Sequence, residues 1–153
     1  MSIDQRIAEL GITLPQPAAP VASYVPAVEQ GGLLHISGQV SFAEDGSLIK
    51  GRLGEDMGVD DGIAAARRCG IMLVAQMKAA LGSLDRVERI VKLGVFVNSD
   101  PAFVEQPKVA NGASELMQDV FGEAGRHARS AVGVAVLPLG VAVEVDAIVA
   151  VKA

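Results

Sequence analysis

The chain has 153 residues, of which 50% are hydrophobic and 20% charged, and its formal net charge is −5. This length fits one domain with a sizeable core, no apolar run reaches the ~18 residues that span a bilayer, and the acidic balance with scattered basic residues argues against a nucleic-acid surface. Cys69 is the only cysteine and the N-terminus is not organised as a signal peptide, so we expect a cytoplasmic protein without a disulfide or a cysteine-based metal site.

The first twenty residues are predicted to form an extension that precedes the main domain. Ser2 opens a capping-box pattern, which predicts a short helix from Ile3 to Leu10. The prolines within Pro15–Pro20 favour an extended connector after that helix. We therefore divide the chain into an N-terminal extension, residues 1–20, and a main domain, residues 21–153.

Seven elements follow in the order β-β-α-β-α-β-β, as hydrophobic periodicity and turn signals indicate. Their ranges are Tyr24–Val28, Leu33–Val40, Asp60–Leu81, Arg86–Val97, Phe103–Phe121, and two valine-rich strands on either side of Pro138–Gly140. Alternation along the third strand places Val91 and Leu93 on the same side. We interpret the last two strands as a hairpin.

One sheet with two helices on one face accommodates every amphipathic stripe, which predicts an α+β sandwich. The other face of the sheet would then stay bare and apolar. Together with the low content of charged residues, this predicts self-association.

Arg129 and Glu144 are charged residues on otherwise valine-rich strands, and buried charges are costly unless paired or used. Alternation places Arg129 above small side chains such as Ala131 and Gly133, a shape that fits a small carboxylate beside a guanidinium. A turn near Pro138 would put Glu144 opposite Gly133 on this same face. The alternative is a buried salt bridge, but a spacing of about 13 Å along one hairpin disfavours it.

Motifs for metals and cofactors are lacking. The sequence has no phosphate-binding loop, no paired metal-ligating histidines and no nucleophile elbow. His35 and His127 lie far apart, and we interpret His35 as a core or edge residue and Cys69 as a packed thiol. We predict no metal and no cofactor.

The C-terminal residues resemble the signature of the YjgF/RidA family, which is also called the L-PSP endoribonuclease family. The matching segments are Ala128-Arg129-Ser130, Leu137-Pro138 and Val143–Ile148, with support from Tyr24–Val28, Leu34–Gln39 and Val109-Ala110-Asn111. The resemblance covers roughly Ser23 to Val151. It implies a chorismate-mutase-like fold and a homotrimer with sites between subunits. It also implies cofactor-free hydrolysis of enamines and imines, such as 2-aminoacrylate, to a keto acid and ammonia.

The resemblance implies roles for particular residues. Arg129 matches the arginine that holds the substrate carboxylate, and Glu144 matches the acid near the attacking water. Further substrate-binding positions are Tyr24, Ser37 and Asn111. These roles fit the chemistry, because hydrolysis needs the carboxylate held still and a water polarised beside the C=N carbon.

Four departures from the family pattern indicate a separate branch with a reshaped pocket. Ala131 stands where the family often has cysteine, and His127 where proline is common, so both are counted among the substrate-binding candidates. Around Ser114 the helix lacks an aromatic that some relatives have. The N-terminal extension is the fourth difference.

Two alternatives to a deaminase remain open. The first is a non-catalytic trimeric module that binds a small carboxylic acid. The second is an endoribonuclease, as the older family name states, which the acidic pI of about 5.0 and the few aromatic residues disfavour.

Overall fold

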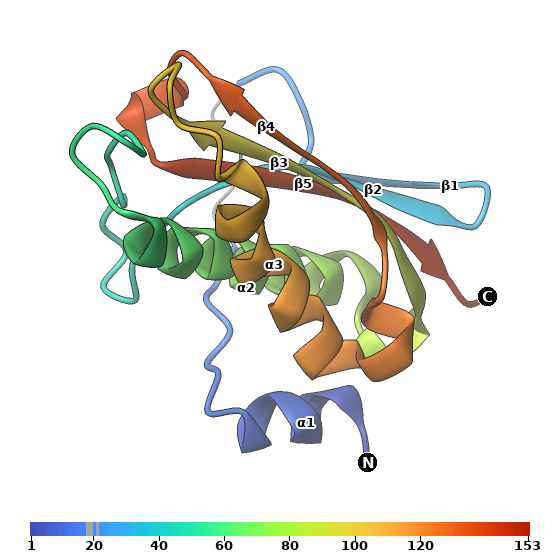
Figure 1. Cartoon of the computed structure of the whole chain (residues 1–153). Helices are drawn as coiled ribbons and strands as arrows, with labels where there is room; N and C mark the ends of the chain where they lie inside the picture. The colour runs from blue at the N-terminus through green and yellow to red at the C-terminus, as the bar shows by residue number, and fades with distance from the viewer. Residues whose placement is uncertain (18–19, 21) are drawn as a thin grey trace.

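The computed structural model describes residues 1–17, 20 and 22–153, so part of the predicted connector and the proposed domain boundary lie outside the described residues. Figure 1 shows a curved sheet with helices on one side. The helices are α1 (Ile3–Glu9), α2 (Val59–Leu81) and α3 (Gln106–Phe121), and the strands are β1 (Ala27–Gln30), β2 (Leu33–Val40), β3 (Val87–Asn98), β4 (Ala128–Val134) and β5 (Val143–Val151).

The five strands form one mixed sheet in the order β1-β2-β5-β3-β4, in which only the β3–β4 pair is parallel. Helices α2 and α3 cover the same face (Figure 1). The predicted α+β class, the order of the elements and the two helices on one face are therefore confirmed.

The predicted C-terminal hairpin is wrong. Strand β5 lies between β2 and β3, whereas β4 pairs in parallel with the outer side of β3. Helix α3 makes the crossover that a parallel pair requires. The turn at Leu139 and Gly140, both with positive φ, then returns the chain to the middle of the sheet. Alternate residues of β5 are fully buried, which suits a central strand better than an edge.

The side-chain pattern of β3 also departs from strict alternation. Ile90 is fully buried and Val91 is 37% exposed, the reverse of the prediction, while Leu93, Val95 and Val97 are buried as expected. The pairing of β3 with β5 shifts between Ile90 and Lys92. This irregularity in the register turns Val91 away from the helices.

Helices α2 and α3 approach each other closely because both carry glycines at the contact. A Cβ added at Gly112 would overlap the backbone carbonyl of Ile63, and one at Gly70 would lie 2.7 Å from a methyl group of Leu116. Helix α2 ends at Gly82, whose φ of 79° is favourable only for glycine. The bounds of α2 agree with the prediction to within one residue.

The predicted N-terminal helix and its capping box are confirmed in α1. Ile7 is buried, and the Arg6 Nε donates to the carbonyl of Asp119 in α3 over 2.8 Å. Asp4 and Lys78 of α2 form an ion pair of 2.8 Å. Helix α1 is therefore attached to the outer side of the helical layer. Whether it counts as a separate unit stays a prediction.

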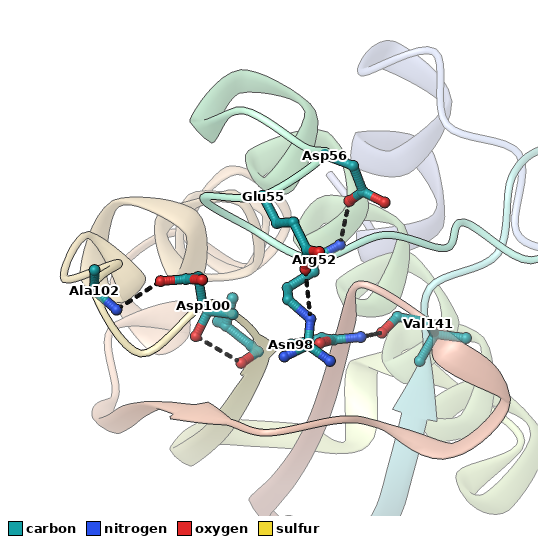
Figure 2. A network of polar contacts seen from close by, with 9 residues as sticks. Arg52, Glu55, Asp56, Asn98, Asp100, Ala102 and Val141 are labelled. Atoms are coloured by element: carbon teal, nitrogen blue, oxygen red, sulfur yellow. Dashed lines mark hydrogen bonds and ion pairs between the residues drawn. The ribbon is translucent and has the colours of Figure 1, made fainter.

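The irregular segment before α2 is held at the C-terminal end of β3 (Figure 2). Leu53 donates its N–H to the Asn98 carbonyl over 2.8 Å, and the Asp100 N–H donates back to the Leu53 carbonyl over 2.9 Å. The buried Asn98 side chain donates to the Val141 carbonyl over 3.1 Å. These bonds tie three chain segments together beside the turn that leads into β5.

None of the helices in the described part of the chain is long and apolar enough to cross a membrane.

Candidate functional site

Arg129 lies on β4 and faces α3. It is aligned with Leu93, a core residue on the helix-covered side of the sheet. Its Nη1 donates to Oδ1 of Asn111 over 2.9 Å and to Oγ of Ser114 over 3.1 Å, and its Nη2 donates to the carbonyl of Pro107 over 3.3 Å. A guanidinium carries five N–H groups, so two are left without a partner among the described residues.

Ser114 connects Arg129 to His127. The Nε2 of His127 lies 2.8 Å from Ser114 Oγ, and its Nδ1 lies 2.6 Å from the Gly125 carbonyl oxygen. Burial lowers the pKa of His127, and the neighbouring Arg129 cation lowers it further against the opposing effect of the Gly125 bond. A pKa lowered from the ordinary 6.5 favours the neutral imidazole at pH 7.

These residues border a shallow pocket of about 240 Å³ between α3 and the start of β4. Its lining is entirely polar or charged and consists of Asn111, Ser114, Gln118, Arg126, His127 and Arg129. Such a lining fits a small anionic group. Of the residues predicted for the site, the structure brings Arg129, Asn111 and His127 together here.

Glu144 lies on the uncovered face of the sheet. On β5 it is aligned with Phe96, which is in turn aligned with Val132, 45% exposed on that face. A Cβ added at Gly38 would overlap the Glu144 carboxylate, so the acid lies directly against the β2 backbone. Half-burial raises the pKa of Glu144, and the nearby Asp146 carboxylate raises it further.

Ser37 lies within β2, and Tyr24 lies three residues before the start of β1. Ser37 donates its hydroxyl to the Val25 carbonyl over 2.9 Å and its N–H to the Pro26 carbonyl over 2.9 Å. These bonds hold the Tyr24–Pro26 segment beside the end of β2. The Tyr24 side chain is 54% exposed.

The prediction that Arg129 and Glu144 share one face is wrong. Arg129 is level with Leu93 under the helices, whereas Glu144 is level with Phe96 on the opposite face. The prediction depended on a β4–β5 hairpin that does not form. That the two residues do not pair is correct, because Arg129 is bonded to α3 instead.

Ala131 follows Arg129 on the same face and packs against the core. The uncovered face is mixed rather than apolar, since it carries Asp146 and Glu144 beside Phe96.

Ser114 was not among the predicted site residues. The one available signal was its position three residues after Asn111, one turn along the same helix face.

The described residues contain no group of three or more His, Cys, Asp or Glu side chains that could hold a metal ion. The Cys69 thiol is fully buried and lies 3.4 Å from the Val143 carbonyl oxygen. Burial raises the pKa of this thiol. It is therefore a packed thiol, as expected.

These features define an α+β domain with a polar, cationic pocket on one side of its sheet and a partly buried acid on the other. Residues 4–150 match the family model described as YjgF/chorismate mutase-like, putative endoribonuclease. The chain belongs to this family. The match begins inside the segment that we predicted as an extension.

Individual relatives support the assignment. Protein TCP17 of Trypanosoma cruzi is 59% identical over 141 residues, which are 92% of this chain and 88% of that protein. The crystal structure of a putative endoribonuclease from Shewanella oneidensis is 34% identical with a TM-score of 0.94, covering 99% of this chain and 100% of the other.

Two further solved structures resemble the chain with lower TM-scores. RidA from a Psychrobacter species is 29% identical with a TM-score of 0.60, over 89% of this chain and 94% of that one. Escherichia coli TdcF with bound serine is 26% identical with a TM-score of 0.60, over 90% of this chain and 94% of that one.

Proposed function

We propose that this protein hydrolyses reactive enamines and imines of the 2-aminoacrylate type to a 2-keto acid and ammonia. The observation that supports the proposal is the hydrogen bonding of the Arg129 guanidinium. Three of its N–H groups are fixed on α3, and two remain for a substrate carboxylate. An arginine fixed in this way can orient a small acid without losing much side-chain entropy on binding.

Glu144 is proposed to polarise the attacking water. Its raised pKa makes the carboxylate a stronger base than an exposed glutamate, which suits proton transfer from water near neutral pH. An enamine first takes up a proton from solvent at its terminal carbon and so becomes the imine. Water then adds to the C=N carbon, and loss of ammonia from the resulting carbinolamine gives the keto acid. Tyr24, Ser37 and Ala131 are proposed to shape the rest of the pocket.

Because Arg129 and Glu144 lie on opposite faces of one sheet, a single copy cannot bring both to one small substrate. We propose a homotrimer in which Arg129 of one copy meets Glu144 of the next. The uncovered face with the exposed Val132 and the partly buried acids is the surface available for that contact.

The test is an assay in which a pyridoxal-phosphate dehydratase generates 2-aminoacrylate and keto-acid release is followed. The protein should accelerate release, and Arg129→Ala should remove the acceleration while the protein stays folded. Equal rates with and without the protein would contradict the deaminase proposal.

A second candidate is a module that binds small carboxylic acids without turning them over. The related TdcF, whose structure contains serine, favours it. Saturable binding of a keto acid without any acceleration would establish this reading in place of the first. Cleavage of RNA finds little support in a net charge of −5.

A further inference from the structure

We infer that Ser114 and His127 are positioning residues for Arg129, which fix the guanidinium so that its two free N–H groups face the carboxylate. This inference rests on the proposed role of Arg129 as the carboxylate clamp.

The geometry gives the contacts a direction. The Gly125 carbonyl can only accept, so Nδ1 of His127 carries the proton at the 2.6 Å contact. In a neutral imidazole Nε2 is then an acceptor, and Ser114 must donate its hydroxyl proton to it over 2.8 Å. This leaves the Ser114 lone pairs directed at Arg129, whose Nη1 donates to Oγ over 3.1 Å.

Burial makes this arrangement rigid. Ser114 is 6% exposed in the middle of α3, so its hydroxyl depends mainly on protein groups for hydrogen bonds. Asn111, one turn earlier, accepts from the same Nη1 atom. Two acceptors on one helix face thus fix one end of the guanidinium, and His127 fixes the orientation of the second acceptor.

The first experiment reads the imidazole in the wild-type protein by ¹⁵N NMR, so it needs no variant. We expect a neutral ring protonated at Nδ1 near pH 7. A ring protonated at Nε2 would reverse the direction of the Ser114 bond and would overturn the inference.

The second experiment titrates pyruvate, the keto acid that 2-aminoacrylate would yield, into the wild type, Ser114→Ala, His127→Ala and the double variant. Loss of a bond to a charged group should raise Kd about 10-fold in Ser114→Ala. The double variant should be no weaker than Ser114→Ala alone, because both residues act through one bond, whereas independent structural effects would add. Ser47→Ala, which removes a hydroxyl in an exposed turn, is the matched control.

The outcomes separate the two proposals. This inference alone is overturned if the wild type binds pyruvate and folded Ser114→Ala binds it with an unchanged Kd. It is likewise overturned if the losses of affinity in the double variant are additive. Wild-type protein that neither binds pyruvate nor hydrolyses the enamine overturns the proposed function and this inference with it.

Discussion

Arg129 and Glu144 face away from each other across the same sheet. Arg129 is in register with Leu93 beneath α3, and Glu144 is in register with Phe96 on the uncovered side, three residues further along β3. Two charges on strands that follow each other in the sequence are therefore separated by the thickness of the sheet and by β3, which lies between β4 and β5. The Arg129 guanidinium is hydrogen-bonded to α3, and the Glu144 carboxylate packs against the β2 backbone at Gly38.

The Glu144 carboxylate should reduce the stability of the isolated fold at neutral pH. Its folded pKa lies above the ordinary 4.5 because of burial and Asp146. Its stabilising contribution is therefore complete below about pH 4.5 and is lost as the pH rises through the folded pKa. Glu144→Gln should raise the midpoint of thermal unfolding at pH 7, with little change at pH 4, as measured by circular dichroism.

Asp146→Asn is the matched control for Glu144. Burial raises the pKa of Asp146 as well, against the opposing effects of Gly94 and Lys92, so this variant should also be stabilised at pH 7. Only Glu144→Gln should lose enamine hydrolysis. Equal loss of activity in both variants would argue against a specific role for Glu144.

The rate should depend on the ionisation of Glu144. If its carboxylate polarises the water, kcat/KM should rise with pH through a pKa above 4.5. A pH–rate profile of enamine hydrolysis with a rapid coupled assay tests this. A profile that is flat between pH 4 and 7, or one whose acid limb persists in Glu144→Gln, would point to another group.

Gly38→Ala should displace the Glu144 carboxylate, since the added Cβ would occupy its position. Misplacement of a catalytic group by about 1 Å costs on the order of 100-fold in rate, so a fall of 10- to 100-fold in kcat is expected. Gly58→Ala is the control, because a Cβ there meets nothing within 4 Å and its φ is −90°. Similar rates for both variants would contradict the placement of Glu144.

Helix α1 should contribute to stability rather than to chemistry. Ile7 is 5% exposed, and its truncation in Ile7→Ala should lower the free energy of unfolding by about 2 kcal/mol. The exposed Glu9→Ala change should cost less than about 0.5 kcal/mol. Urea titrations measure both. A loss of activity per folded molecule in Ile7→Ala would instead connect the extension to the site.

Much of the fold follows from local pattern. The apolar period and terminal glycine of α2 fix its bounds, and the capping box fixes α1, because these signals act within a few residues. The pairing of β4 and β5 could not be read in this way. A short turn between two strands favours a hairpin, yet the choice of partner depends on burial across the whole sheet.

The candidate site was predictable only in part. Alternation correctly put Ala131 beside Arg129, because both lie on one strand. The face of Glu144 was wrong, since it required a register between two strands that do not pair. Ser114 escaped notice because its neighbour His127 is distant in sequence, and only packing of α3 against β4 brings them together.

The most direct test of a site shared between copies is complementation. Arg129→Ala and Glu144→Gln should each be inactive alone. Unfolded together and refolded as mixed oligomers, they should regain activity in about one quarter of their sites, in which an intact Arg129 meets an intact Glu144 from another copy. Recovery near that fraction in the enamine assay is the predicted result. Mixed oligomers, confirmed by native mass spectrometry, that stay as inactive as either parent would contradict a site built from two copies.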